Sequence, residues 1–209
     1  MSHEEDLIAK ALERNNLLSL KNSIPSFTKF LLLLQQWNRV FNLTSINDFS
    51  EMIDLHLIDS LLLLPFLTGQ RFLDVGSGGG LPGIPLAILN PHQEWVLLDK
   101  NNKKTHFLTQ ASAELGLKNV SVVQSRCEDF HPEQGFDTIL ARAFATLKTF
   151  ADVTQHLLNS EGKLLAMKGK YPQEELAEVA RNFTIKEIVR LQIKGRKVER
   201  HLVCLQKKE

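Results

Sequence analysis

An acid and a run of glycines stand near the middle of this sequence, in the segment 72–81, which reads Phe-Leu-Asp-Val-Gly-Ser-Gly-Gly-Gly-Leu. The apolar residues around Asp74 predict a buried strand, and Gly76, Gly78 and Gly80 predict a tight turn that leads into a helix. Glycine adopts backbone angles that side chains forbid, and it lets a ligand approach the main chain closely. The segment therefore predicts a nucleotide-binding loop, with a glycine-rich turn that binds nothing as the alternative.

The glycine spacing separates two kinds of nucleotide site. A dinucleotide-binding fingerprint needs its third glycine three residues after the second, and Leu81 occupies that position here. An acid, one residue and three alternating glycines instead resemble the first motif of class I methyltransferases, which bind S-adenosylmethionine. On this interpretation Asp74, Gly76, Gly78 and Gly80 belong to the cofactor site.

Further polar residues follow the next predicted strands, and a ligand of an open parallel sheet binds beyond the carboxyl ends of its strands. Asp99 follows the second strand and is suited to accept hydrogen bonds from both ribose hydroxyls. The main chain near Cys127 and the carboxylate of Glu128 follow the third and are suited to the adenine amino group. Arg142 ends the fourth strand, where a guanidinium needs an anionic partner. That partner is a ligand or, alternatively, Asp74 or Glu128 in an ion pair.

Strands and helices alternate from residue 71 onward, as in a parallel sheet covered by helices on both faces. The expected strands are 72–75, 95–98, 120–124, 136–141, 163–168, 186–193 and 201–206, and the expected helices are 85–89, 102–115, 147–158 and 172–182. A short turn around Gly195 predicts that the last two strands form an antiparallel hairpin. We therefore expect an α/β fold of the class I S-adenosylmethionine-dependent methyltransferase type, which is Rossmann-like, with a mostly parallel seven-stranded sheet and a C-terminal antiparallel hairpin.

Residues 6–67 have helical periodicity instead. Helices are expected from about Leu7, from Phe27 to Phe41, and from Ser50 to about Leu64, before Pro65. We expect two parts, an N-terminal helical extension at 1–69 and an S-adenosylmethionine-binding methyltransferase core at 70–209.

Composition narrows the class of protein. The chain has 209 residues, is 43% hydrophobic and carries a net charge of +1, which suits one globular core and excludes a polycation. The acidic start lacks the features of a signal peptide, and no apolar run is as long as a membrane span, so we expect a cytoplasmic protein without a membrane partner. Neither the two cysteines nor the seven histidines show metal-ligand spacing. We expect a monomer that needs no metal and binds no DNA.

Local basic clusters offer contacts for RNA despite the small net charge. The segment 194–209 contains six basic residues and only two acidic ones, although a solvated hairpin and tail explain this composition equally well. The candidates for phosphate or base contacts are Lys103, Lys104, Arg142, Lys168, Arg196, Lys197, Arg200 and His201.

Other reactive residues are not assigned to catalysis. His56 and Asp59 share a face of a predicted helix, where a tertiary contact is the favoured interpretation over catalysis. Cys127 and Cys204 do not follow proline, as the nucleophile of cytosine-C5 methyltransferases typically does. The chain also lacks the Asn-Pro-Pro-Tyr or Asp-Pro-Pro-Tyr loop of enzymes that methylate exocyclic amines.

Several stretches in the same order along the chain resemble the RsmG family, formerly glucose-inhibited division protein B, the bacterial small-subunit ribosomal RNA guanine-N7 methyltransferases. The resemblance lies in 37–39, 42–45, His56, 59–60, 74–85, 124–126, 142–145 and 199–202, and Leu-Pro-Gly-Ile-Pro at 81–85 and Arg-Ala-Phe-Ala at 142–145 are its specific parts. The sequence departs from the family at Gly79, where alanine or proline is usual, and at Leu55, where a basic residue commonly precedes the histidine.

The resemblance implies cofactor contacts at Gly76, Leu81, Cys127, Glu128 and Arg142, and a target guanine in the 530 loop of 16S rRNA, on naked RNA or on the small ribosomal subunit. Guanine N7 has a lone pair and no proton to lose, so in-line methyl transfer, which leaves S-adenosylhomocysteine, needs no general base and no catalytic residue is assigned. Two alternatives stay open: a methyltransferase of another acceptor, and a protein that binds S-adenosylmethionine or RNA without turnover.

Overall fold

The computed structural model describes residues 1–179 and 183–208. Within these residues seven strands form one sheet in the order β3-β2-β1-β4-β5-β7-β6. Strands β1 to β5 are parallel, and β7 runs antiparallel to both β5 and β6. The strand bounds are β1 Arg71–Val75, β2 Glu94–Asp99, β3 Val120–Gln124, β4 Phe136–Arg142, β5 Leu158–Lys168, β6 Phe183–Arg190 and β7 His201–Lys207. The sheet that the sequence predicts is confirmed.

Helices precede the sheet and connect its strands. The α-helices are α1 His3–Arg14, α2 Ile24–Phe41, α3 Phe49–Met52, α4 Asp59–Leu61, α5 Gly83–Leu89, α6 Asn102–Glu114, α7 Leu147–Thr154 and α8 Gln173–Val179. Short 3-10 segments lie at Leu18–Ser23, Leu64–Phe66, Cys127–Asp129 and Gln155–Leu157, and a π-helix at Ile53–Ile58 joins α3 to α4. No helix in the described ranges is both long and apolar enough to cross a lipid bilayer.

Side-chain caps fix where several helices begin. Ser2 and Glu5 form a reciprocal capping box on α1, and Asn101 accepts hydrogen bonds from two backbone amides at the start of α6. Thr146 caps α7 in the same way. These caps satisfy amides that have no partner inside their helix. Helices α6 and α7 begin at the predicted residues, whereas α1 begins at His3, four residues before the expected start at about Leu7.

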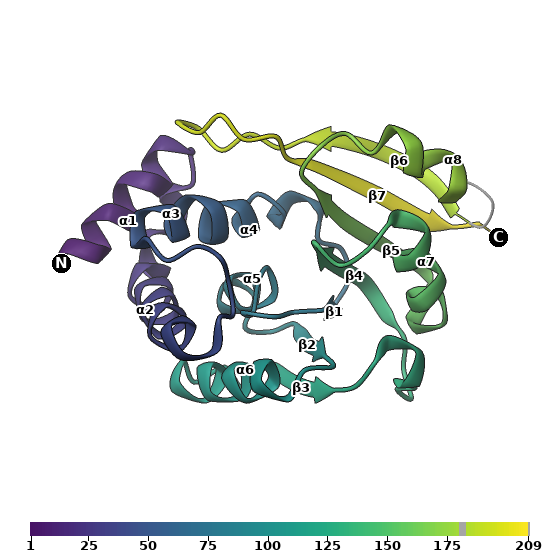
Figure 1. The fold of residues 1–209 in the computed structure, drawn as a ribbon, viewed down its shortest axis with the longest axis horizontal. Coiled ribbons are helices and arrows are strands. Elements are labelled where there is room, and N and C mark those ends of the chain that lie inside the picture. Colours follow the sequence, from purple (N-terminus) through teal and green to yellow (C-terminus); the bar gives the residue numbers. More distant parts are fainter. Residues whose placement is uncertain (180–182, 209) are drawn as a thin grey trace.

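Alternate residues of the central strands face opposite layers of helices. Phe72 and Trp95 stack on the face that α5 covers, with ring centroids 4.6 Å apart. Leu73 and Val96 point to the other face, where they pack with Phe150 of α7. In Figure 1 the helices α7 and α8 lie at one end of the view and the N-terminal helices at the other.

The N-terminal helices pack on the core. Phe27, Leu34 and Ile58 share an apolar cluster with Leu97 of β2 and Phe107 of α6. By the ordinary scale for apolar burial, each such fully buried side chain contributes about 1.5–3 kcal/mol. The helical segment is therefore docked firmly enough to supply a wall of a site, while a division between residues 69 and 70 stays a prediction.

The C-terminal hairpin differs from the expected one. Strand β6 begins and ends three residues earlier than the predicted 186–193, and residues 191–200 cross toward α1 (Figure 1). Ile193 is the reason, because it is 1% exposed and packs among the N-terminal helices. The connection is thus longer than the predicted short turn. The predicted helix 172–182 is observed as α8, and its residues 180–182 lie outside the described residues.

Candidate functional site

A cleft of about 290 Å³ lies at the carboxyl ends of the central parallel strands. This is where an open α/β sheet binds its ligands, and β1 and β4, between which the chain reverses its direction of winding, adjoin the cleft. Its lining includes Gly76, Asp99, Lys104, Cys127, Glu128 and Phe144. Residues of the loops after four predicted strands are therefore brought together as the sequence indicated, although their contact with a cofactor stays a prediction.

The glycine turn needs the absence of side chains. Gly76, Gly78 and Gly80 have φ values of 67, 58 and 75 degrees, in the region that favours glycine. A Cβ at Gly80 would lie 2.5 Å from Ile84 Cδ1, and a Cβ at Gly76 would lie 2.8 Å from the Phe144 ring. The turn consequently leaves bare backbone beside the cleft.

Asp74 holds the two ends of this turn through hydrogen bonds. Its carboxylate is fully buried, and Oδ2 accepts hydrogen bonds from Ser77 Oγ at 2.6 Å and from the Gly83 amide at 2.9 Å. Oδ1 has no hydrogen-bond partner among the described atoms. Burial raises the pKa of Asp74 to about 6. Leu81 is likewise buried, with 4% exposure, so both residues form the base of the turn.

This raised pKa predicts a pH dependence of stability. An acid whose pKa rises on folding contributes stability that is complete below its unfolded pKa and is lost as pH rises through the folded pKa. The pKa of Asp74 rises from 3.8 to about 6 on folding. As the pH rises through this range, the free energy of unfolding of the wild type should fall by about 3 kcal/mol relative to that of Asp74→Asn. Urea denaturation of both proteins at pH values across this window measures the difference. A difference that is constant with pH would show that Asp74 does not titrate there.

Asp99 ties the second loop to the glycine turn. Its Oδ2 accepts a hydrogen bond from the Gly78 amide at 3.0 Å, and Oδ1 accepts one from the Asn101 amide at 2.9 Å. Lys104 Nζ lies 3.8 Å from Oδ2. A carboxylate has about four lone-pair sites, so Asp99 retains acceptor capacity toward the cleft.

Cys127 is a buried wall of the cleft. Burial, followed by the neighbouring charges of Glu128 and Asp99, raises the pKa of its thiol to about 12. The thiol is therefore protonated at neutral pH and is no nucleophile. Glu128 beside it is exposed and carries its carboxylate at the rim.

A second cavity of about 420 Å³ adjoins the first. Its lining includes Thr44, His56, Arg142, Lys168, Gly169 and Arg200. Ala143 lines both cavities, so the carboxyl end of β4 separates them. The sequence did not predict this cavity, because its wall joins the N-terminal helices to β5 and the C-terminal connection.

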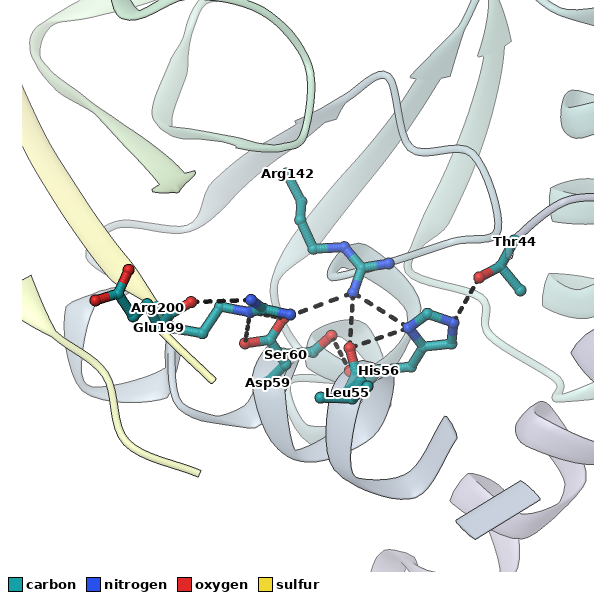
Figure 2. Close-up of polar contacts among 8 residues, drawn as sticks. All are labelled: Thr44, Leu55, His56, Asp59, Ser60, Arg142, Glu199 and Arg200. Carbon is teal, nitrogen blue, oxygen red and sulfur yellow. Dashed lines mark hydrogen bonds and ion pairs between the residues drawn. The ribbon is translucent and has the colours of Figure 1, made fainter. Parts of the chain in front are cut away.

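Two arginines share one buried carboxylate at the floor of this second cavity (Figure 2). Asp59 is 1% exposed, Arg200 Nε donates to its Oδ1 at 3.1 Å, and Arg142 Nη1 lies 3.7 Å from its Oδ2. Arg142 Nη1 also donates to Leu55 O at 3.1 Å. Burial lowers the pKa of Arg142, and the Asp59 charge opposes that shift. The ion-pair partner of Arg142 is thus Asp59, and neither Asp74 nor Glu128 forms an ion pair with it in the described part of the chain.

His56 stands beside Arg142 as a neutral ring. Its Nδ1 lies 3.0 Å from Leu55 O and its Nε2 lies 2.9 Å from Thr44 Oγ1. Burial, then the charge of Arg142, lowers the pKa of His56 to about 4. The tertiary contacts expected for His56 and Asp59 are present. In the sequence, the polar residues His56 and Asp59 stand inside the apolar helical run 52–64, and this was the available signal that the run borders the second cavity.

The remaining candidate RNA residues divide between the two cavities and the surface. Lys103 is exposed on α6, beside the cleft residue Lys104, and Lys197 is exposed in the connection before β7. Lys168 Nζ donates to Ala145 O at 2.7 Å and to Glu175 at 2.8 Å.

Arg196 and His201, the last two candidates for RNA contact, also have partners within the protein. Arg196 Nε donates to Asp54 at 2.7 Å, and His201 Nδ1 lies 3.2 Å from Gly169 O. These ion pairs and hydrogen bonds set the positions of the side chains, and their contact with RNA stays a prediction.

Comparisons with known proteins show the family to which the chain belongs. The sequence model of a family described as rRNA small subunit methyltransferase G matches residues 23–203. A protein of Pasteurella multocida (strain Pm70) named ribosomal RNA small subunit methyltransferase G is 50% identical over 177 residues, which cover 85% of this chain and 84% of that protein. One of the same name from Laribacter hongkongensis (strain HLHK9) is 46% identical over 205 residues, covering 98% and 99%.

Solved structures are similar in fold at low sequence identity. The glycopeptide N-methyltransferase MtfA, complexed with S-adenosyl-L-methionine, has a TM-score of 0.65 and 11% identity over 74% of this chain and 88% of that chain. A SAM-dependent methyltransferase from Aquifex aeolicus has a TM-score of 0.58 and 18% identity over 75% and 93%. The predicted class I methyltransferase fold is confirmed.

Proposed function

This chain belongs to the rRNA small subunit methyltransferase G family, and we propose that it transfers a methyl group from S-adenosylmethionine to N7 of a guanine in the 530 loop of 16S rRNA. The observation that carries the proposal is the pair of adjoining cavities at the carboxyl end of β4. One suits the cofactor and the other an acceptor.

The cleft residues fit S-adenosylmethionine. A turn that excludes side chains at Gly76 and Gly80 leaves main chain available to the methionine and ribose parts of the cofactor. Asp99, Cys127 and Glu128 all line the cleft, which supports the proposal that Asp99 accepts hydrogen bonds from the ribose hydroxyls and that Cys127 and Glu128 hold the adenine. The side chain of Arg142 lines the second cavity, and its predicted cofactor contact remains part of the proposal.

The proposed reaction requires no general base. S-adenosylmethionine supplies an electrophilic methyl group on a sulfonium, and guanine N7 offers an unprotonated lone pair, so no proton has to be removed. The protein then has to orient the two reactants, which is worth roughly 7–11 kcal/mol when the alignment is good. His56, with its pKa lowered to about 4, and Cys127, with its pKa raised to about 12, are both neutral at pH 7 and add no charge beside the reacting atoms.

The RNA substrate is expected to reach the site from the basic rim. The major groove of A-form RNA is too narrow for side chains, so the target base has to lie in a loop or be turned out of its helix. Lys103 on α6 and Lys197 in the connection before β7 are both exposed, which supports the proposal that they contact phosphate. Affinity for RNA should accordingly fall as the salt concentration rises.

Replacing Asp99 with alanine should weaken S-adenosylhomocysteine binding by about 10- to 100-fold, because a hydrogen bond to a charged group contributes about 1.5–3 kcal/mol. The change also removes the carboxylate that holds the Gly78 amide. Titration calorimetry measures the affinity, and Glu161→Ala, which removes an exposed carboxylate far from the cleft on β5, is the matched control. Equal affinities in the two variants would remove Asp99 from the cofactor site.

Methyl transfer to isolated RNA tests the proposed reaction. The protein is incubated with tritium-labelled S-adenosylmethionine and with either deproteinised 16S rRNA or small ribosomal subunits, and the RNA is digested to nucleosides. Labelled 7-methylguanosine that maps to the 530 loop supports the proposal. Label in another nucleoside or another molecule supports a different acceptor, and cofactor binding without transfer supports a non-catalytic protein.

A further inference from the structure

The second cavity has properties that a purine site requires. It touches the cofactor cleft through Ala143, whose φ of 51 degrees turns the chain sharply at the end of β4. Such a φ is uncommon for a residue other than glycine and marks a position that the surrounding structure holds in place. The small alanine side chain leaves the two cavities next to each other, as in-line transfer between a cofactor and a base requires.

Arg142 presents a free hydrogen-bonding edge beside this cavity. Every polar contact that it makes with the described residues involves Nη1, which lies near Leu55 O, His56 Nδ1 and Asp59 (Figure 2). Its Nε and Nη2 therefore retain their donors. Leu55 O and Asp59 hold Nη1 in place. Because the guanidinium is planar and rigid, the free edge formed by Nε and Nη2 then has a fixed orientation.

Asp59 offsets part of the positive charge around Arg142, which lowers the repulsion toward a base that becomes cationic. Asp59 lies against both Arg142 and Arg200, which leaves the trio with one net positive charge instead of two. His56, on the other side, is neutral and accepts the Thr44 hydroxyl when its Nδ1 donates to Leu55 O. The guanidinium thus keeps its donors while Asp59 offsets part of its repulsion toward a methylated purine.

We propose, resting on the proposed function, that the cavity lined by Thr44, His56, Arg142, Gly169 and Arg200 binds the acceptor guanine, and that the free edge of Arg142 donates to its O6. Guanine presents two acceptors, O6 and N7, on the edge that carries the methylation site, whereas adenine presents an acceptor and a donor there. A donor on O6 leaves the N7 lone pair open toward the cofactor cleft. It also rejects adenine, because two donors would then face each other.

Gly169 provides a variant that fills this cavity without straining the chain. It lines the cavity, its φ is not in the left-handed region, and a Cβ built on it has no atom within 4 Å. Leucine at this position is therefore expected to reduce the space of the proposed base site without displacing neighbouring atoms. The matched control is Ala177→Leu, which adds the same side chain at an exposed position of α8.

Single-turnover methyl transfer at saturating RNA and S-adenosylmethionine is then compared with binding. Gly169→Leu should lower the transfer rate by about 100-fold, because displacement of a reacting group by an ångström costs about that much. Gly169→Ala should cause a smaller loss. The affinity for S-adenosylhomocysteine should stay within about twofold, since the cavity adjoins the cofactor cleft but does not form it. An unchanged rate in Gly169→Leu, or an equal loss of cofactor affinity, would overturn the inference.

Substituted RNA tests the O6 contact without altering the protein. Inosine at the target keeps O6 and N7 and should retain the transfer rate within about threefold, whereas 2-aminopurine, which lacks O6, should lose about 10- to 100-fold. Equal rates with inosine and 2-aminopurine would contradict the Arg142 contact. Failure of the unmodified protein to methylate guanine in any RNA would instead contradict the proposed function, so the two failures are distinguishable.

Discussion

Replacing Asp59 with alanine is expected to lower the free energy of unfolding by about 3–5 kcal/mol at pH 7, because breaking a buried ion pair leaves its partner uncompensated. Arg142 and Arg200 both face this carboxylate, which is 1% exposed. Their side chains are 22% and 27% exposed, so water replaces the lost carboxylate only in part. Urea denaturation followed by circular dichroism measures the change.

A surface ion pair provides the matched control for this prediction. Lys148 and Asp152 on α7 lie 2.5 Å apart with 54% and 43% exposure. Exposed pairs contribute about 0–1 kcal/mol, so Asp152→Ala should change stability by less than about 1 kcal/mol. If Asp59→Ala lost no more than Asp152→Ala, the two arginines would not depend on the shared carboxylate.

The sheet and the cofactor loops could be predicted because local patterns specify them. Short continuous apolar runs, glycines at 76, 78 and 80, and polar residues just after each run are visible in a short window of sequence. A parallel sheet then brings the loops to one edge whatever the remaining packing. Asp99, Cys127 and Glu128 therefore lie together as expected.

The second cavity could not be predicted, because its wall depends on contacts between distant segments. Arg142 was assigned Asp74 or Glu128 as possible partners from the neighbouring loops, while its observed partner, Asp59, comes from the N-terminal helices. The position of β6 was wrong by three residues for a similar reason. Ile193 continues the strand pattern in sequence, but its side chain is buried among helices, and burial there outweighs the strand pattern.

The N-terminal helices also hold the C-terminal connection in place. Asp54 accepts from Arg196 at 2.7 Å and pairs with Arg14, while the Lys194 amide donates to Asn15 Oδ1 at 2.8 Å. Arg200, at the end of the same connection, then meets Asp59 in the second cavity. The helical segment thereby positions one wall of the proposed acceptor site.

Replacement of Arg142 by lysine should lower the rate of methyl transfer at saturating RNA and cofactor by about 10²- to 10³-fold, the usual effect of removing one preorganised donor. The guanidinium is expected to do two things at once, because Nη1 donates to Leu55 O and lies near Asp59, while the proposal assigns Nε and Nη2 to the acceptor. A lysine ammonium preserves the charge beside Asp59 but has no second, rigidly oriented edge.

Single-turnover kinetics and titration calorimetry with S-adenosylhomocysteine separate two roles for Arg142. If its main contribution is to the acceptor, Arg142→Lys loses rate while cofactor affinity changes by less than about threefold. Arg190→Lys, at an exposed position of β6, is the matched control and should keep the wild-type rate. A normal rate at saturation combined with weakened cofactor binding would assign Arg142 to the cofactor alone. In that case recognition of O6 would have to come from another donor of the second cavity.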